Sequence, residues 1–172
     1  MFDPIPPMAP LSIGPLTVTE RPVSLASLAI RRGREADVTA AAQTAGIALP
    51  HPGSYAPPAF WLAPDMWMIE GPAAQDLRAD LLTIFHDAAS ITEQTGAWAC
   101  YDLTSTTLPN LMERLSNFDF SAAADNAASR TIIDHLGCIL IKHGPTTLTL
   151  YAPRSATQSL LHAITTAAKS LP

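Results

Sequence analysis

Proline spacing limits what the first third of this sequence can fold into. Six prolines fall within the first 22 residues, and four more fall between residues 50 and 58. Proline fixes φ and has no backbone N–H to donate, so we expect both stretches to be extended or irregular. We therefore predict that residues 1–22 form an extended arm without a core of its own, that residues 50–58 form a loop, and that residues 23–172 form the folded domain.

The predicted arm is apolar for a segment of this kind. Its apolar side chains are Phe2, Ile5, Met8, Leu11, Ile13 and Leu16. Exposed apolar surface of this extent usually marks a contact, so the arm is expected to be covered. Two arrangements satisfy that expectation, one in which the arm wraps its own domain and one in which it docks on a partner.

Beyond the arm, short strands alternate with amphipathic helices. We predict strands at 25–30, 59–62, 67–69, 91–95, 97–103 and 148–151, and helices at 36–45, 72–85, 108–115 and 155–171. Turn residues pair 59–62 with 67–69 as a hairpin, and Gly96 pairs 91–95 with 97–103 as another. Residues 117–129 are predicted to be a loop, followed by one long strand kinked near Gly137 that ends at His143. Gly46 and Ser155 are the expected helix end and helix cap.

This order predicts an α+β fold. It contains two split β-α-β pseudo-repeats of the ferredoxin-like kind, the second lacking one strand. Hairpins make neighbouring strands antiparallel, and crossovers through helices are expected to add parallel neighbours. The prediction is therefore a pair of mixed sheets with helices packed on them.

Composition excludes several classes of partner. The formal net charge is −5, which argues against a nucleic acid or an anionic membrane as a partner, because both attract basic surfaces. No stretch reaches the roughly 20 apolar residues of a membrane-spanning helix, and the first residues do not resemble a signal peptide. The two cysteines, Cys100 and Cys138, are far apart and are expected to be buried thiols. These features together predict a cytoplasmic protein.

The sequence shows no motif able to carry chemistry. The histidines have no metal-binding spacing, and the P-loop, Gly-x-Gly-x-x-Gly and Gly-x-Ser-x-Gly motifs are missing. Cys100 is a candidate nucleophile, but its alternation with Trp98 on a predicted strand favours a buried side chain. We therefore predict no catalytic, cofactor-binding or metal-binding residue in this chain.

Three residues are candidates for an interface with another subunit. Trp61 and Trp67 flank the turn of one predicted hairpin, and Arg154 follows a proline at the start of the last helix. Aromatic and arginine side chains are enriched at protein interfaces when they are exposed. The alternative for the two tryptophans is ordinary core packing, and for Arg154 it is a solvated side chain.

Several segments resemble one family. They are Trp61-Leu62-Ala63-Pro64-Asp65-Met66-Trp67-Met68, Asp102-Leu103-Thr104 before the 108–115 helix, Arg130-Thr131, and Tyr151-Ala152-Pro153-Arg154-Ser155-Ala156 before the last helix. Their order and spacing, from about residue 24 to 171, are similar to those of the gamma subunits of heterotetrameric sarcosine oxidases. One departure is Glu70, which stands where another apolar residue is expected. A second is the density of prolines between residues 50 and 58.

The resemblance implies a fold, partners and a role. The fold would be that of the folate-binding domain of aminomethyltransferases, and the partners would be alpha, beta and delta subunits. NAD and tetrahydrofolate would belong to alpha, FAD and FMN to beta, and zinc to delta, with no cofactor in this chain. The complex would convert sarcosine to glycine and hydrogen peroxide, with the methyl carbon passed to tetrahydrofolate or released as formaldehyde. This chain would be a non-catalytic subunit that stabilises the assembly.

Three alternatives stay open at this point. The relatives of the fold allow a free-standing folate-binding protein of the aminomethyltransferase kind. Similar subunits also occur in N-methylglutamate dehydrogenase, so the resemblance indicates the type of complex more clearly than its substrate. A thiol enzyme that uses Cys100 is the third alternative.

Overall fold

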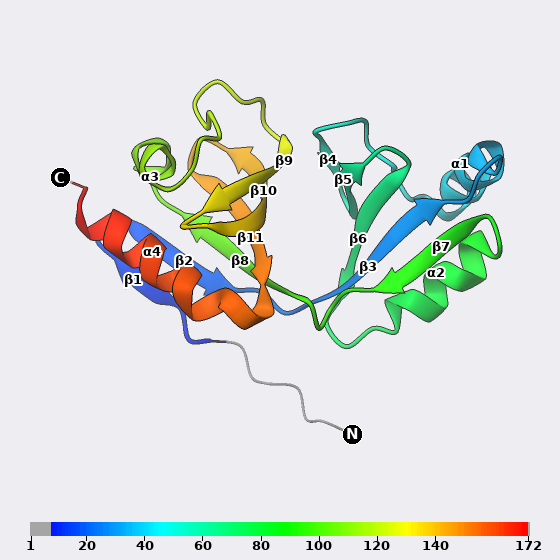
Figure 1. The fold of residues 1–172 in the computed structure, drawn as a ribbon, viewed down its shortest axis with the longest axis horizontal. Helices are drawn as coiled ribbons and strands as arrows, with labels where there is room; N and C mark the ends of the chain where they lie inside the picture. Colours follow the sequence, from blue (N-terminus) through cyan, green and yellow to red (C-terminus); the bar gives the residue numbers. More distant parts are fainter. Residues whose placement is uncertain (1–7, 172) are drawn as a thin grey trace.

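Two sheets and four α-helices make up the described part of the chain in the computed structural model, residues 8–171 (Figure 1). One sheet contains β4 (Tyr55–Ala56), β5 (Ala59–Ala63), β6 (Met66–Pro72), β3 (Val23–Ile30) and β7 (Ala89–Glu93), in that order. The other contains β1 (Leu11–Ile13), β2 (Leu16–Glu20), β8 (Trp98–Thr104), β11 (Thr147–Pro153), β10 (Leu136–Gly144) and β9 (Ala128–Ile133). The helices are α1 (Glu35–Ala45), α2 (Leu77–Phe85), α3 (Leu108–Leu115) and α4 (Thr157–Lys169). The α+β prediction is confirmed.

The five-stranded sheet has the predicted split β-α-β arrangement. Its chain order is β3, α1, β5, β6, α2 and β7, and its spatial order is β5-β6-β3-β7 with β4 added at the edge. The crossover through α2 makes β6 and β7 parallel, but β3 lies between them and is antiparallel to both. The same holds for β3 and β5, which β6 separates. The prediction of mixed sheets was wrong for this reason, since all the strand pairs described are antiparallel.

The six-stranded sheet repeats this plan with a strand from a different part of the chain. β8, α3, β10, β11 and α4 occupy the positions of β3, α1, β5, β6 and α2. The position of β7 is filled by β2, which pairs antiparallel with β8. The strand that the second repeat was predicted to lack therefore comes from the beginning of the chain.

This use of β2 changes the interpretation of residues 1–22. Residues 1–7 lie outside the described residues. Residues 11–20 form the β1–β2 hairpin, and Leu16 and Val18 are fully buried in the core under the six-stranded sheet. Proline did not prevent this because Pro15 lies in the turn between the strands and Pro22 lies after β2. This part of the predicted arm is a component of the domain.

Two other element predictions were wrong. β7 and β8 are not a hairpin, because β7 pairs with β3 and β8 pairs with β2 and β11 in the other sheet. The long strand predicted before His143 is two strands, β9 and β10, which pair antiparallel. The turn between them is formed by Asp134 and His135, both with positive φ. These residue types tolerate the left-handed region better than most, but neither is a strong turn signal.

Capping residues account for the end of α1 and the start of α2, but not for the start of α4. α1 ends at Gly46, as predicted, with φ 69°. α2 begins at Leu77, not at Pro72, because the Asp76 carboxylate accepts a hydrogen bond from the backbone N–H of Ala79. α4 begins at Thr157 after a 3₁₀ turn over Arg154–Ala156, and the side chain of Ser155 does not cap it. No helix within residues 8–171 is long and apolar enough to cross a membrane.

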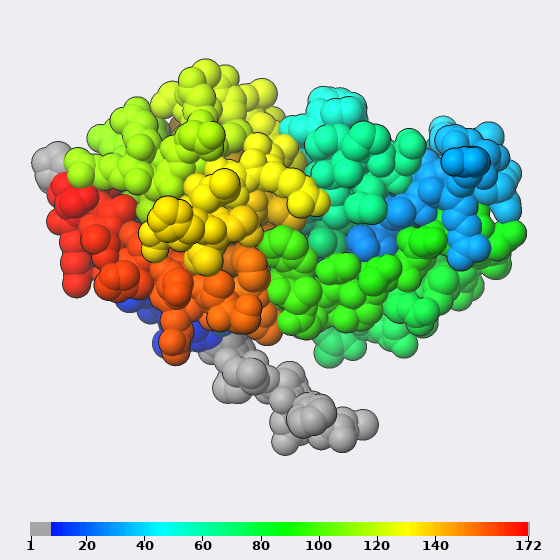
Figure 2. Space-filling view, viewed as in Figure 1, coloured from blue at the N-terminus to red at the C-terminus, as the bar shows by residue number. Residues whose placement is uncertain are grey.

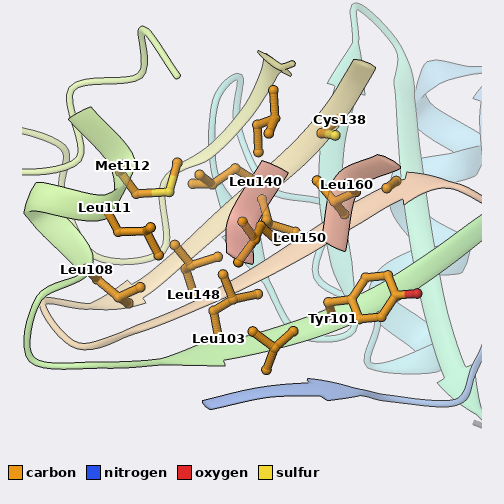
Figure 3. Close-up of a cluster of buried hydrophobic side chains, with 14 of the residues drawn as sticks. Tyr101, Leu103, Leu108, Leu111, Met112, Cys138, Leu140, Leu148, Leu150 and Leu160 are labelled. Atoms are coloured by element: carbon orange, nitrogen blue, oxygen red, sulfur yellow. The ribbon is translucent and has the colours of Figure 1, made fainter. Parts of the chain in front are cut away.

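The buried side chains form three clusters. One lies between the six-stranded sheet and α3 and α4, and includes Leu103, Leu111, Met112 and Leu150 (Figure 3). A second lies between the five-stranded sheet and α1 and α2. The third joins the two sheets on the faces that helices do not cover; its members are Leu25, Phe60, Leu62, Met68, Cys100, Ala128, Ile139, Ile141 and Tyr151. The two halves lie side by side in Figure 2, with the N-terminal hairpin in the same half as α4.

Candidate functional site

A group of polar side chains lies beside the apolar cluster that joins the two sheets. We call it the inter-sheet cluster, and its members are Arg21, Glu70, Asp102, His143, Thr149 and Tyr151. Glu70 belongs to the five-stranded sheet, and Asp102, His143, Thr149 and Tyr151 belong to the other. Arg21 lies in the short connection between β2 and β3, where the chain passes from one sheet to the other.

Arg21 connects the two sheets through two carboxylates. Its Nε donates to Asp102 Oδ2 at 3.0 Å, and its Nη2 donates to Glu70 Oε1 at 3.1 Å. The remaining guanidinium nitrogen, Nη1, lies 3.5 Å from Glu70 Oε2. The planar guanidinium is suited to such two-pronged contacts, which fix orientation as well as charge.

Glu70 is the most enclosed charge of the group. Its side chain is 11% exposed, and Tyr151, which is 1% exposed, donates its hydroxyl hydrogen to the Glu70 carboxylate. Burial and the charge of Glu70 raise the pKa of Tyr151, so the phenol keeps the proton that it donates. Glu70 therefore has one partner in the other sheet and one in the β2–β3 connection, and a buried carboxylate needs such partners.

A relay of hydrogen bonds links His143 to Asp102. The Thr149 hydroxyl donates to Asp102 Oδ1 at 2.7 Å, and His143 Nε2 lies 2.8 Å from the Thr149 oxygen. Because the only hydroxyl hydrogen of Thr149 goes to Asp102, the network assigns the histidine proton to Nε2. Burial lowers the pKa of His143, which favours the neutral ring.

The inter-sheet cluster borders a cleft of about 400 Å³. Its polar lining comes from Arg21, Glu70, Asp102, His143 and Thr149, and from Tyr55, Thr104 and Thr147 at its rim. The Tyr55 ring meets the His143 ring edge-on, with centroids 5.5 Å apart. The cleft is therefore an open groove between the two sheets, lined by several ionisable groups together with the apolar Leu103 and Leu148.

Cys100 is a buried member of the apolar cluster that joins the two sheets, and it is not suited to nucleophilic catalysis. It is 2% exposed, and burial raises its pKa although the nearby Arg21 charge opposes the effect. A working thiolate requires the opposite, a lowered pKa and access to a substrate. The prediction of a buried Cys100 is confirmed, and the thiol-enzyme alternative loses its basis.

One of the two tryptophans predicted to be interface residues, Trp67, holds a loop. Trp61 and Trp67 are direct partners across β5 and β6, and Trp67 packs against the cluster under α1 and α2. The Trp67 indole N–H donates to the carbonyl of Pro50 at 2.7 Å. This bond fixes the start of the proline-rich segment 50–58, in which Tyr55–Ala56 form β4 and are not part of a loop as predicted. Both rings remain partly exposed, so the expected interface role remains a prediction.

Arg154 forms hydrogen bonds with the backbone in and beside the connection between β7 and β8. Its guanidinium donates to the carbonyls of Trp98 at 2.6 Å and Thr95 at 3.3 Å, and it lies 3.7 Å from Glu20. These contacts hold the second place where the chain passes between the sheets. Arg154 is therefore bound within the chain, with 41% of its side chain exposed to solvent or a partner.

Sequence reasoning missed most of the inter-sheet cluster. Arg21 lay in the predicted arm, His143 was named only as the end of a predicted strand, and Asp102 was noted only within a motif. The one available signal was Glu70, a charge in an otherwise apolar strand. Among residues 8–171, no group of three or more His, Cys, Asp or Glu side chains could hold a metal ion.

No protein-family model and no curated protein matches this sequence. Among solved structures, the fold is similar to a chain of the heterotetrameric sarcosine oxidase from Corynebacterium sp. U-96, solved in complex with pyrrole 2-carboxylate. The TM-score is 0.80 at 17% identity, over 90% of this chain and 84% of that chain. The resemblance predicted from the sequence motifs is thus confirmed at the level of the fold.

Two aspartate kinase structures give weaker matches. The enzyme from Clostridium acetobutylicum has a TM-score of 0.44 at 8% identity, over 91% of this chain and 35% of that chain. The regulatory subunit from Thermus thermophilus has a TM-score of 0.44 at 10% identity, over 92% and 99%.

Proposed function

We propose that this chain is a small, non-catalytic subunit of a sarcosine oxidase-type flavoenzyme complex, equivalent to a gamma subunit, and that it stabilises the assembly. The observation that carries the proposal is the TM-score of 0.80 over most of both chains. The match covers 90% of this chain and 84% of that chain, so the similarity is not limited to a short shared segment. The family motifs around Trp61, Asp102 and Arg154 support the same assignment.

The internal contacts of the chain fit a structural role. The inter-sheet cluster and Arg154 fasten both connections between the sheets, so the two halves present fixed surfaces to a partner. Preorganised surfaces bind with a smaller entropic cost than mobile ones. In this proposal the partners are alpha, beta and delta subunits, which hold NAD, tetrahydrofolate, FAD, FMN and zinc.

The chemistry assigned to the complex also remains a proposal. The complex would oxidise sarcosine to glycine with formation of hydrogen peroxide, and the methyl carbon would pass to tetrahydrofolate or leave as formaldehyde. Among the described residues, the one hydroxyl paired with a histidine, that of Thr149, donates its proton to Asp102 and accepts from His143, and Cys100 is held as a thiol. We therefore assign electron and carbon transfer to the partner chains, in a cytoplasmic enzyme.

Co-expression tests the assignment. A tagged copy and an untagged copy of this chain would be expressed together with three candidate partner chains and purified through the tag. Native mass spectrometry should show one tagged copy for each partner chain and a bound flavin, with the untagged copy left behind. A tagged chain that elutes alone, beside an active flavoenzyme that lacks it, would overturn the proposal.

The substrate is tested on the purified complex. Rates with sarcosine and with N-methylglutamate distinguish the proposed oxidase from an N-methylglutamate dehydrogenase. Calorimetry of the isolated chain with tetrahydrofolate addresses the free-standing alternative. Micromolar binding without assembly would favour that alternative.

A further inference from the structure

Four strands, β1, β4, β7 and β9, lie at the edges of the two sheets. Three of them are protected against pairing with another chain. β4 has only two residues, and β1 has three, with Pro10 before it and Pro15 in the turn after it. β7 carries the exposed polar side chains of Ser90 and Thr92 and ends at the charged Glu93. Short length, proline and polar or charged side chains are common means of preventing edge pairing.

β9 is the least protected of the four edges. It has six residues without a proline, and the side chain of Ile132 is 62% exposed. No other large hydrophobic side chain within residues 8–171 is exposed in this way. In Figure 2, β9 and its turn to β10 (yellow) lie on the surface that faces the viewer. An exposed apolar side chain on an open edge marks a place where another chain can pair.

The backbone of β9 has free hydrogen-bonding groups on its outer side. In an antiparallel strand, the N–H and C=O groups of alternate residues point to the same side. The N–H of Ala128 donates to the carbonyl of Gly53, away from β10, so the groups of Arg130 and Ile132 also point away from β10. Neither of these two N–H groups has an acceptor among the described residues. Both positions are therefore open to a further strand.

Arg130 determines which strand this edge accepts. Its exposed side chain lies on the same face of β9 as that of Ile132, because the two residues are two positions apart. Its Nε lies 3.4 Å from the carbonyl of Leu62, and it forms no salt bridge with a described residue. A carboxylate on the incoming strand gains an ion pair here, whereas a lysine or arginine is repelled. Such charges contribute more to specificity than to affinity.

A second copy of this chain fits the edge poorly. Antiparallel pairing of two copies through the same groups places Arg130 opposite Arg130, Ile132 or Asp134 of the other copy. The first pairing brings like charges together, and the second places each Ile132 beside a charge. The third requires an extended Asp134, but this residue lies in the turn with φ 46°. The edge therefore fits a different chain.

We propose that the outer edge of β9 receives an extended strand from a partner subunit, with an acidic side chain beside Arg130 and an apolar side chain over Ile132. An extended chain presents N–H and C=O groups with a two-residue repeat of roughly 7 Å, which is the repeat of the free groups on β9. In strand addition of this kind, main-chain hydrogen bonds supply affinity and alternate side chains supply specificity. This inference rests on the proposed function, because the strand belongs to another chain of the same complex.

Amide hydrogen exchange tests the pairing, measured at single residues on the full chain alone and within the co-purified complex. In the chain alone, Arg130 and Ile132 should exchange faster than Thr131 and Ile133, whose N–H groups face β10. In the complex, exchange at Arg130 and Ile132 should slow at least about tenfold, as expected when a free amide gains a hydrogen bond. Thr131 is the internal control, because its N–H faces β10 in both states.

A proline substitution blocks the edge. Ile132→Pro removes one outward N–H and no bond to β10, and proline is tolerated at such edge positions. It should weaken assembly of the complex about tenfold or more, because the incoming strand loses a donor and meets the proline ring. Ser12→Pro on β1 is the matched control. Ile13 pairs with Leu16 across the turn, so the N–H of Ser12 also points outward, and assembly should be unchanged.

Failure of this inference and failure of the proposed function give different results. If the complex forms but Arg130 and Ile132 exchange as fast as in the free chain, only the inference is overturned. If no complex forms, both are overturned. If the isolated chain dimerises with these two amides protected, the occupant is a second copy and the inference is wrong. It is also overturned if Ile132→Pro assembles as Ser12→Pro does, and if the Ile132 variant does not fold, the wild-type exchange pattern decides.

Discussion

The hydroxyl of Tyr151 donates a hydrogen bond to the carboxylate of Glu70, although the two residues belong to different sheets and are 81 positions apart in the sequence. Arg21 contacts the same carboxylate from the connection between the sheets. The two halves of the molecule are therefore joined by a specific polar contact in addition to apolar packing.

Replacing Glu70 should destabilise the fold. Glu70→Ala leaves the buried Tyr151 hydroxyl without its acceptor and Arg21 with one carboxylate, so we expect a loss of about 2–4 kcal/mol in the free energy of unfolding. Urea denaturation measures this loss. Glu113→Ala, at an exposed helical position, should change stability by less than about 0.5 kcal/mol. Equal stabilities of the Glu70 variant and the wild type would show that the contact is incidental.

The role of β2 is tested at Leu16, which is 2% exposed. Leu16→Ala removes a core side chain and should lower the free energy of unfolding by about 2–4 kcal/mol. The exposed neighbour Thr17 provides the control, because Thr17→Ala keeps the strand and its pairing with β8. If the Leu16 variant is as stable as the Thr17 variant, β2 is not part of the core.

Trp67 should be the more sensitive of the two paired tryptophans. Trp67→Phe removes the hydrogen bond to the carbonyl of Pro50, and we expect a loss of about 1 kcal/mol beyond that of Trp61→Phe. The indole of Trp61 makes no hydrogen bond among the described residues, so its variant controls for ring size. Equal losses would contradict a role for the Trp67 indole in holding the loop.

Stability should fall as the pH is lowered through the titration range of His143. The unfolded histidine takes up a proton near pH 6.5, whereas burial lowers the pKa of the folded one. Between these two values the unfolded state binds more protons, so acid favours unfolding until both states are protonated. Melting temperatures at pH 7.5 and 5.5 should therefore differ less in His143→Asn than in the wild type. His162→Asn, at an exposed position, should behave as the wild type does.

Both thiols should be unreactive in the folded protein. Burial raises the pKa of Cys100, and it raises the pKa of Cys138 to about 11. At pH 8 we expect a disulfide reagent to react roughly 100-fold more slowly in buffer than in urea. Rapid modification of Cys100 in the native state would return the thiol enzyme to consideration.

Local sequence signals predicted the elements whose determinants are local. The hairpin around Asp65 and the helix that ends at Gly46 were identified from turn and capping residues. The turn at Asp134 and His135 was missed because it contains no glycine, proline or asparagine, although Asp and His adopt positive φ more often than most residues. The assignment of β7 and β8 to different sheets depends on partners distant in sequence, which Gly96 does not specify.

The inter-sheet cluster could not be predicted from the sequence for a related reason. Its contacts join positions 21, 70, 102 and 151, and no spacing rule connects such positions. Glu70 stood out as a charge within an apolar strand, but its partner Arg21 lay in a segment expected to have no core.

The central claim is that this chain contributes surface and rigidity while its partners carry out the reaction. The most direct measurement is hydrogen peroxide production from sarcosine by the purified chain alone and by the complex reconstituted with and without it. We predict no turnover by the chain alone, turnover by the full complex, and a less stable or unassembled enzyme when the chain is omitted. Turnover by the isolated chain would contradict the account.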